Sequence, residues 1–281
     1  MKIIIEIVLY NKSFADSMTL MSIFSMRDYL GRYPIKIYIQ DNSDQSMLDP
    51  NFLCELSKHI ECEYVHSPQN LTLREIYNYR ISQLSSGDYL CLLDDDTTLT
   101  EKYFSSAIHC IQMKPEIGLI VPTIKVHNKT YSPHRSYYFY NKPIKKNLKG
   151  QQPTRFMSAI NSGMIINSAF FLKSEFTYPA YADFYGTDKV FFDRYSEFYE
   201  YFYVLDVCIE HNVSNHPKNP DDVSYINIIN KTVRFWTSYL RDKKIILFLY
   251  FTYMFLYTLK LSIVRKNNVF ILNFIKKRFK K

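Results

Sequence analysis

Three consecutive aspartates form the motif of this sequence that most clearly suggests chemistry. Asp94, Asp95 and Asp96 come directly after a run of apolar residues. Carboxylate oxygens are preferred ligands of Mg²⁺ and Mn²⁺, and these ions in turn bridge phosphate oxygens. Neighbouring carboxylates repel one another, and a bound cation relieves that repulsion. The triplet therefore predicts a divalent metal site for a phosphate-bearing ligand. The alternative is a solvated acidic turn that caps the next helix through Asp96 or Thr97.

The elements around this triplet predict an α/β fold. Strand and helix patterns alternate along the first part of the chain, which implies right-handed crossovers and a mostly parallel sheet. Apolar, β-branched runs predict strands at residues 3–10, 35–39, 63–65 and 89–93. Apolar residues at helical spacing predict helices at about 14–31, 50–60 and 72–85.

Polar residues follow most of these strands. In open parallel sheets, ligands bind beyond the carboxyl ends of the strands. Three of the four expected strands end in polar residues at that edge: Tyr10-Asn11, Asp41-Asn42 and Asp94–Asp96. This clustering predicts a ligand site along the edge.

The second part of the chain is less regular. Strands are expected at residues 117–123 and 164–166, and residues 127–155, which are basic and rich in tyrosine, are expected to form a long binding loop. Asp188 opens an expected helix after Gly186, so it is either a general base or an ordinary helix N-cap. Asp183 and Asp193 are weaker candidates for the base.

The order of several short motifs resembles that of family 2 glycosyltransferases with the GT-A fold. The resemblance spans roughly residues 1–215, and its weight lies in the ordered series, because the acidic element alone is weak. The motifs are Tyr10-Asn11, Asp41-Asn42-Ser43, Leu93-Asp94-Asp95-Asp96, Asn161-Ser162-Gly163-Met164, Gly186-Thr187-Asp188 and His211.

The resemblance implies a role for each motif. Asp96 is the direct metal ligand, His211 a further metal or diphosphate ligand, and Asp188 the general base that deprotonates an acceptor hydroxyl. The residues implied at the donor nucleotide are Tyr10, Asn11, Asp41, Asp94 and Asp95. Those implied at the sugar and acceptor pocket are Asn161, Ser162 and Gly163, although these three also suit an ordinary strand-entry turn.

Two departures from the family pattern affect the donor's position. Thr187 stands where the family often has a glutamate, and Asn70-Leu71-Thr72 lacks the usual glycine. Arg74 and Asn78 share one face of the next helix, where they either help to hold the nucleotide or form a polar surface. Basic side chains of the irregular stretch either contact diphosphate or are solvated: His134, Arg135 and Arg155.

Charge is concentrated at the C-terminal end. Residues 241–281 hold eleven Lys or Arg and a single acid, Asp242, within a chain whose formal charge is +8. A nucleic-acid protein more often spreads its basic residues over the binding domain, so a nucleic-acid partner is not expected. The five cysteines include no CxxC pair, which favours reduced thiols in a cytosolic setting.

The basic tail also carries a long apolar segment. Residues 245–264 contain one charge, Lys260, and form a helix of about 30 Å at 1.5 Å per residue. Residues 269–281 mix apolar and basic side chains, as in helices that lie on anionic membranes. We expect monotopic binding at the cytoplasmic face of the inner membrane. The alternatives are a true span and a helix packed on the catalytic domain.

Together these features predict a GT-A domain at 1–240, with a nucleotide-binding half at 1–100 and an acceptor half at 101–240, and a membrane-associated tail at 241–281. The expected activity is an inverting transfer, dependent on Mn²⁺ or Mg²⁺, from a UDP- or dTDP-sugar to a lipid-linked glycan of O-antigen or capsule type. One alternative, a sugar nucleotidyltransferase, needs a glycine-rich loop after the first strand, and the sequence there has no glycine. The other is a non-catalytic membrane-associated binding protein.

Overall fold

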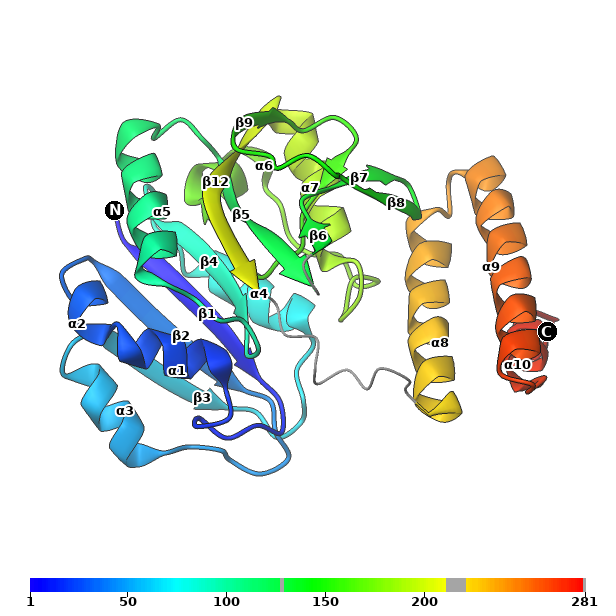
Figure 1. Ribbon diagram of the computed structural model, residues 1–281, viewed down its shortest axis with the longest axis horizontal. Helices are drawn as coiled ribbons and strands as arrows, with labels where there is room; N and C mark the ends of the chain where they lie inside the picture. The colour runs from blue at the N-terminus through cyan, green and yellow to red at the C-terminus, as the bar shows by residue number, and fades with distance from the viewer. Residues whose placement is uncertain (127–128, 211–220, 280–281) are drawn as a thin grey trace. The chain divides into compact units, whose positions relative to one another are not determined.

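The computed structural model describes residues 1–126, 129–210 and 221–279, with residues 278 and 279 described by their backbone alone. The chain divides into two compact units, Met1–Val213 and Ser214–Lys281 (Figure 1). Each unit is described by itself below. The second unit thus begins before residue 241, where the composition of the tail changes.

The first unit contains a central sheet and helices on both of its faces. Its strands are β1 (Ile3–Leu9), β2 (Ile35–Asp41), β3 (Glu61–His66), β4 (Tyr89–Asp94), β5 (Leu119–Val126), β6 (Lys129–Ser132), β7 (His134–Tyr137), β8 (Tyr140–Pro143), β9 (Gly150–Pro153), β10 (Met157–Ser158), β11 (Met164–Asn167) and β12 (Tyr201–Glu210). Its helices are α1 (Met18–Ser25), α2 (Arg27–Leu30), α3 (Pro50–Ser57), α4 (Leu73–Ser82), α5 (Glu101–Met113), α6 (Ser168–Ser174) and α7 (Thr187–Phe198).

The central sheet is mixed and mostly parallel, as the sequence predicts. Its strand order is β3-β2-β1-β4-β11-β5-β12-β9, with β6 paired to β5. β1 to β4 are parallel to one another, and β11 runs antiparallel between β4 and β5. β12 is parallel to β5. The carboxyl ends of β1, β2, β4, β5 and β12 therefore lie along one edge.

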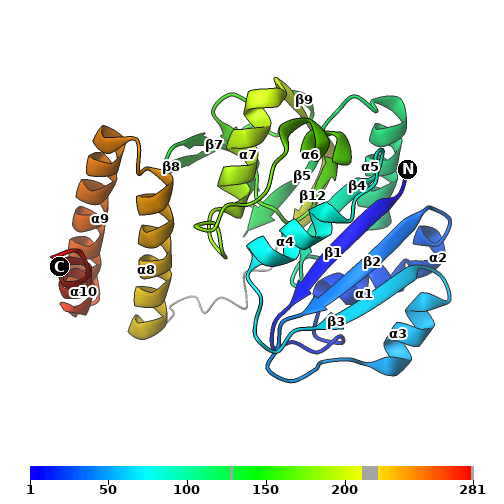
Figure 2. The same ribbon diagram turned by 180° about the vertical axis from the view of Figure 1, so that it is seen from behind.

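The pattern of β1 explains why helices cover both faces. Ile3, Ile5 and Ile7 are buried on the face of α1 and α5, and Ile4 is buried on the other. Figures 1 and 2 show α5 in front of the sheet in one view and α4 in front of it in the other. An apolar strand without alternation is typical of a parallel strand that is covered on both sides.

Two expectations about local structure were wrong. Residues 127–155 do not form one long loop, because β6, β7, β8 and β9 lie within them, and β10-β7-β8 form a second small sheet. Tyrosine and β-branched residues favour strands, and β7 alternates buried and exposed side chains over only four residues, too few to recognise from the sequence. The helix expected at 14–31 is two helices, α1 and α2, which meet at Met26.

The second unit consists of α8 (Asp222–Tyr239), α9 (Lys244–Val264) and α10 (Val269–Phe279). Asp222 joins the helices by accepting hydrogen bonds from Arg265 at 2.8 Å and from Asn267 at 2.6 Å. Tyr225 and Tyr257 share a hydrogen bond of 2.7 Å between α8 and α9. By length and composition α9 is apolar enough to cross a membrane.

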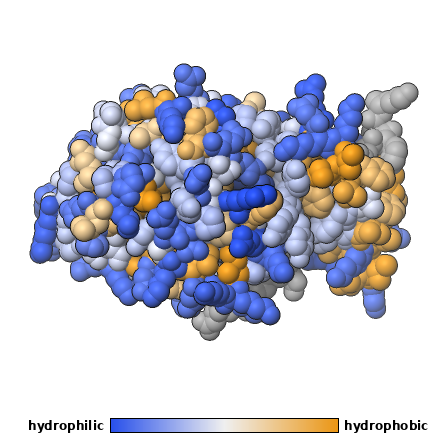
Figure 3. All heavy atoms as spheres, turned by 90° about the horizontal axis from the view of Figure 1, so that it is seen from above, coloured by the Kyte–Doolittle hydropathy of each residue, from blue (hydrophilic) through white to orange (hydrophobic). Residues whose placement is uncertain are grey.

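Apolar side chains of α9 face outward as well as inward. Tyr250 and Met254 are buried, whereas Ile245 is 78% exposed and Phe248 is 70% exposed. Orange, hydrophobic atoms accordingly gather on the surface of this unit in Figure 3. A helix that is apolar all round is typical of one that meets lipid or another protein.

Candidate active site

The parallel register brings the ends of the first strands together. Leu9 pairs with Asp41, and Val8 pairs with Asp94, so the motifs after β1, β2 and β4 lie side by side. The backbone N–H of Asn11 donates to Ser43 Oγ at 2.8 Å and ties two of these motifs. Tyr10 is 51% exposed at the same edge. The edge is thus continuous, with an accessible aromatic ring beside it.

The three aspartates do different things. Asp95 forms an ion pair with Lys12, and its pKa is raised chiefly by burial, against the effect of Lys12. The carbonyl of Asp95 accepts from Ser17 Oγ at 3.0 Å, at the N-terminus of α1. Asp94 and Asp96 are half-buried. The triplet is therefore divided between Asp95, whose ion pair anchors the β1–α1 loop, and the two half-buried carboxylates of Asp94 and Asp96 at the end of β4.

These two carboxylates fit a Mg²⁺ or Mn²⁺ site that is completed by the ligand. Among the residues that the structure describes, no three acidic, histidine or cysteine side chains converge as a preformed metal cluster. Mg²⁺ is commonly held by one or two carboxylates together with substrate phosphates, so a full protein cage is not required. The predicted ligand His211 lies outside the described residues, and the preceding strand, β12, ends at Glu210 on this edge.

Ser162 connects the acid triplet to the turn before β11. Its hydroxyl lies 2.6 Å from Thr97 Oγ1 and accepts from the backbone N–H of Asp94 at 3.3 Å. Gly163 has φ 82°, and a Cβ there would lie 2.8 Å from Pro122 Cγ. Only glycine fits this position without strain. These contacts fix the turn against the end of β4.

Asn161 connects this turn to Thr187, the residue before Asp188. Its Nδ2 donates to Thr187 Oγ1 at 2.7 Å, at the first residue of α7. Its Oδ1 and the hydroxyl of Tyr178 are buried without a hydrogen-bond partner among the described residues. Buried polar atoms of this kind carry a free-energy cost unless a ligand or water satisfies them. Both atoms indicate a polar ligand near the start of α7.

Asp188 is not a helix N-cap. Gly186 is the N-cap of α7, at φ 75°, and makes no side-chain capping bond. Asp188 accepts from the backbone N–H of Lys189 at 2.8 Å. Burial raises the pKa of its carboxyl above the usual range, opposed by this hydrogen bond and by the charge of Lys189. A carboxylate with a raised pKa is a stronger base, as a general base requires.

The two weaker candidates for the base are paired elsewhere. Asp183 accepts from Arg74 Nε at 3.3 Å, and Asp193 forms an ion pair with Lys189 one turn along α7. Asn78 exchanges two hydrogen bonds with the backbone of Tyr178, at 3.0 and 2.7 Å. Arg74 and Asn78 therefore hold the segment before α7 in place, a role that the sequence does not reveal.

Asp41 is buried and bonded within the protein. One oxygen accepts from the N–H of Ser43 at 2.9 Å, and the other accepts from the N–H of Met47 at 2.8 Å and from the hydroxyl of Tyr64 at 2.5 Å. Burial opposes ionisation, but these hydrogen bonds together hold the pKa of Asp41 below its usual range. Asp41 thus orders the loop after β2 through these hydrogen bonds to its backbone.

Sequence patterns missed Lys12 and Tyr64. Lys12 is the only cation in the β1–α1 loop, a signal that was available, whereas Tyr64 reaches Asp41 from a neighbouring strand. Among the basic residues of the irregular stretch, His134 is buried, donates from Nδ1 to the carbonyl of Tyr131, and has its pKa lowered by burial. Arg155 lies 5.0 Å from the centre of the Phe156 ring.

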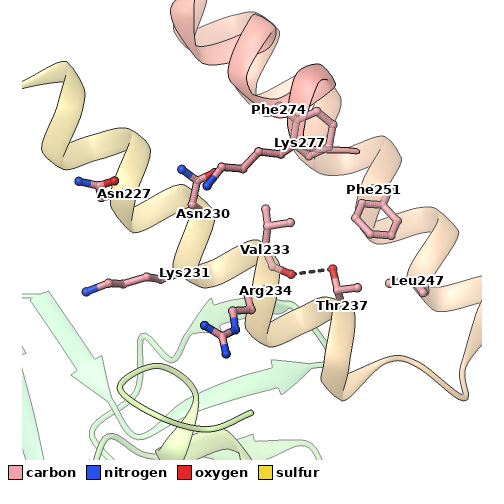
Figure 4. A pocket seen from close by; sticks show the side chains of 10 residues that line it. All are labelled: Asn227, Asn230, Lys231, Val233, Arg234, Thr237, Leu247, Phe251, Phe274 and Lys277. Carbon is pink, nitrogen blue, oxygen red and sulfur yellow. Dashed lines mark hydrogen bonds between the residues drawn. The ribbon is translucent and has the colours of Figure 1, made fainter. Parts of the chain in front are cut away.

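A hollow lies within the second unit. Its volume is about 910 Å³, and Figure 4 shows its lining of apolar, uncharged polar and basic side chains from α8, α9 and α10. The apolar members include Val233, Leu247 and Phe251. The basic members are Lys231, Arg234 and Lys277. Such a lining suits an amphiphile with an apolar chain and an anionic group.

Known structures share the fold of this chain, although no family model and no curated protein matches its sequence. GalNAc-T7, in a crystal structure with UDP, GalNAc and Mn²⁺, matches with a TM-score of 0.58 and 12% identity over 75% of this chain and 43% of that chain. S. aureus TarS in complex with UDP-GlcNAc matches with a TM-score of 0.52 and 12% identity over 84% of this chain and 66% of that chain.

A structure of TarS residues 1–349 matches over 100% of this chain and 93% of that chain, at 10% identity and a TM-score of 0.50. The match with GalNAc-T7, by contrast, spans less than half the length of the GalNAc-T7 chain. These similarities establish the GT-A fold.

Proposed function

We propose that this chain is an inverting, metal-dependent glycosyltransferase that moves a sugar from a UDP- or dTDP-sugar to a lipid-linked glycan. One observation carries the proposal. Two hydrogen bonds of the consecutive residues Asn161 and Ser162, one with the N–H of Asp94 and one with Thr187 Oγ1 beside Asp188, tie the end of β4 to the start of α7. They join the strand edge that we assign to the donor diphosphate to a carboxylate of raised pKa. The GalNAc-T7 and TarS structures with UDP or UDP-GlcNAc agree with a nucleotide-sugar donor.

In this proposal the nucleotide lies along the ends of β1, β2 and β4. The exposed ring of Tyr10 and the backbone of Asn11 line the base, and Asp41 acts through the loop that it orders. Asp94 and Asp96 would hold Mn²⁺ or Mg²⁺, and Asp95 would support them through its ion pair with Lys12. Such an ion, when bound, would supply the positive charge that stabilises a departing nucleoside diphosphate.

Asp188 then acts on the acceptor. Its carboxylate takes the proton of an acceptor hydroxyl as the hydroxyl oxygen forms a bond to the anomeric carbon and the nucleoside diphosphate leaves. A single displacement of this kind inverts the anomeric configuration and needs no protein nucleophile. Burial of Asp188 keeps the proton affinity high, and the unpaired atoms of Asn161 and Tyr178 are placed to bind the sugar or the acceptor.

The second unit supports a lipid-linked acceptor. The outward apolar face of α9 fits the interfacial region of a membrane, and basic side chains such as Lys243, Lys244 and Arg265 lie at its ends. The hollow between the three helices pairs apolar walls with cations, which suits a lipid chain with a phosphate group. We place the protein at the cytoplasmic face of the inner membrane, in O-antigen or capsule synthesis.

A donor screen tests this function. The full chain is incubated with UDP- and dTDP-sugars in the presence of Mn²⁺, Mg²⁺ or EDTA, with and without polyprenyl-diphosphate-linked saccharides, and nucleoside diphosphate release is measured. The proposal expects metal-dependent release that increases with acceptor. A chain that binds no nucleotide sugar with metal present, or that releases diphosphate equally in EDTA, contradicts it.

A further inference from the structure

One segment of the first unit contains no acidic residue. Residues 117–174 hold nine Lys or Arg and neither Asp nor Glu. The segment includes the small sheet β10-β7-β8. Elsewhere in the first unit acidic and basic side chains are mixed, so the small sheet lies in a segment whose own charge is entirely positive.

The register of the small sheet places like side chains opposite one another. Arg135 pairs with Lys142, and Tyr137 pairs with Tyr140. Along β7 the side chains alternate, so that Arg135 and Tyr137 are exposed while His134 and Ser136 are buried. Directly paired residues project to the same side of a sheet. One outward face therefore carries two cations and two tyrosines, and we call it the β7–β8 face.

This arrangement costs stability in the protein alone. Like charges directly opposite each other in an antiparallel pair are unfavourable. Tyr137 is 43% exposed and Tyr140 is 56% exposed, so neither ring contributes fully to a core. The neighbouring Phe156 is 50% exposed and has φ 56°, a conformation that bulky residues rarely adopt. An anion held between Arg135 and Lys142 would offset the repulsion.

The aromatic rings form one patch with the cations. The rings of Tyr137 and Phe156 lie 5.4 Å apart with 31° between their planes. Arg155 lies over Phe156 on the β9–β10 connection. Sugar rings present faces of C–H groups that pack on aromatic rings, while the phenolic hydroxyl of tyrosine remains in water. The combination fits a chain of sugar rings with anionic substituents.

The sheet is connected to the start of α7. β10 packs against α7, and the N–H of Ile160 donates to Ser132 Oγ at 3.1 Å. Desolvation and the charge of Asp188 together raise the pKa of the Tyr131 hydroxyl, which places that hydroxyl within the electrostatic reach of Asp188. A ligand on the β7–β8 face is therefore attached to the part of the molecule that carries the proposed base.

We propose that the β7–β8 face binds the acceptor, and that the acceptor is an acidic glycan. Its carboxylate or phosphate groups lie between Arg135 and Lys142, and its sugar rings pack on Tyr137, Tyr140 and Phe156. The inference rests on the proposed glycosyltransferase function and adds to it a class of acceptor. Charge-assisted hydrogen bonds from arginine to such groups are among the strongest in proteins.

Binding to defined oligomers tests this proposal without donor or metal. The full chain is titrated with a galacturonate decamer, a glycerol-phosphate decamer and the neutral maltodecaose, by calorimetry at about 0.15 M salt, where long-range charge effects are screened. We expect at least one acidic oligomer to bind ten-fold or more tightly than maltodecaose. R135Q/K142Q should weaken that binding at least ten-fold, and Y137S/Y140S should weaken it as well.

The control for charge is K145Q/K146Q, which removes two exposed lysines of the same acid-free segment outside the sheet. The control for aromatic rings is Tyr79→Ser, because Tyr79 is 63% exposed on α4. Both should bind nearly as the parent does. Equal losses in R135Q/K142Q and K145Q/K146Q would show nonspecific attraction, and failure of both acidic oligomers to bind would also overturn the proposal.

Two further readouts separate the possible failures. Binding of R135Q/K142Q to phosphatidylglycerol vesicles shows whether the face serves the membrane, and a loss there with unchanged oligomer binding overturns the proposal. Thermal unfolding and nucleotide-sugar binding are measured for every variant. A chain that binds acidic oligomers but no nucleotide sugar contradicts the proposed function alone. A chain that binds nucleotide sugars but no acidic oligomer contradicts the acceptor class alone.

Discussion

The two units of this chain use apolar residues in opposite ways. In Met1–Val213 they fill both faces of a parallel sheet, and polar residues gather where the strands end. In Ser214–Lys281 apolar residues pack between the three helices and also cover the outside of α9. The first pattern builds a rigid edge for chemistry, whereas the second leaves a surface that needs a non-aqueous partner. In the proposed function, the first unit would carry the catalysis and the second unit the binding to a membrane.

Charge follows the same division. Buried carboxylates of the first unit are individually held, as Asp41 is by Ser43 and Tyr64. The positive charge of residues 241–281 is instead largely exposed, for example at Lys243 and Lys266. Substitutions in the first unit should therefore change activity or stability, and those on the outside of the second should change membrane binding alone.

The largest effect should come from Asp188→Asn. An amide cannot accept the acceptor proton, so we expect transfer to fall by about 10²–10⁴-fold while nucleotide-sugar binding is kept. In the parent, transfer should fall as the pH is lowered through the raised pKa of Asp188, because only the ionised carboxylate is a base. Single-turnover rates across pH measure both effects.

Asp183→Asn is the matched control for this base, since Asp183 is paired with Arg74. This variant should lose far less transfer activity than Asp188→Asn. Unchanged transfer by Asp188→Asn would show that Asp188 is not the general base.

The next effect concerns the buried ion pair of the first unit. Arg80 donates to Glu6 at 2.5 Å, and both are buried. Arg80→Met leaves Glu6 buried without its partner and should lower the free energy of unfolding by about 3–5 kcal/mol. Glu6→Met combined with Arg80→Met should recover most of this loss. Urea unfolding measures the free energy of unfolding of each variant. A loss under about 1 kcal/mol for Arg80→Met would contradict the prediction.

The same pair predicts a pH dependence. Burial is the main cause that raises the pKa of Glu6 from 4.5 to about 7, so the folded protein retains this proton at higher pH than the unfolded chain does. The contribution of Glu6 to stability should therefore decrease as the pH rises from about 4.5 to about 7. Glu6→Met with Arg80→Met removes this contribution.

A third prediction concerns the outside of α9. Phe248 is 70% exposed and Leu256 is 58% exposed. Changing both to glutamate removes apolar burial in lipid and adds like charge, so affinity for anionic vesicles should fall at least about ten-fold. Vesicle flotation measures it. Leu172→Glu, at a site 62% exposed on α6, is the control, and equal losses in both would remove the assignment of α9 to the membrane.

The smallest effect should come from Tyr64→Phe. It removes one hydrogen bond to Asp41 and should lower the free energy of unfolding by about 1 kcal/mol at neutral pH. Because the pKa of Asp41 is lowered in the folded protein, its stabilisation is present above the unfolded pKa and is lost as the pH falls through the folded one. The variant should lose less on acidification, and an identical acid profile would exclude the proposed coupling.

Much of the strand edge could be predicted from the sequence, because it depends on local patterns. Apolar runs that end in Asn11, Asp41 or Asp94 identify both the strand and its polar end. The parallel order then places those ends together. The fold class was confirmed for this reason.

The remaining features depend on contacts between distant residues. The pairing of Asp95 with Lys12, and of Arg74 with Asp183, joins segments that no sequence period relates. β8 has no buried side chain, so its strand has no apolar signature at all. The break between α1 and α2 at Met26 likewise leaves the helical spacing of apolar residues almost unchanged.

The central claim is that the edge beyond β4 holds a nucleotide diphosphate through a divalent cation, and UDP binding with and without Mn²⁺ tests it most directly. Calorimetry should show tight binding with Mn²⁺, a loss of at least about ten-fold in EDTA, and a similar loss for Asp96→Ala. Asp206→Ala, which removes an exposed carboxylate of β12, should bind as the parent does. UDP binding that is equal in EDTA, or unchanged by Asp96→Ala, would contradict the account.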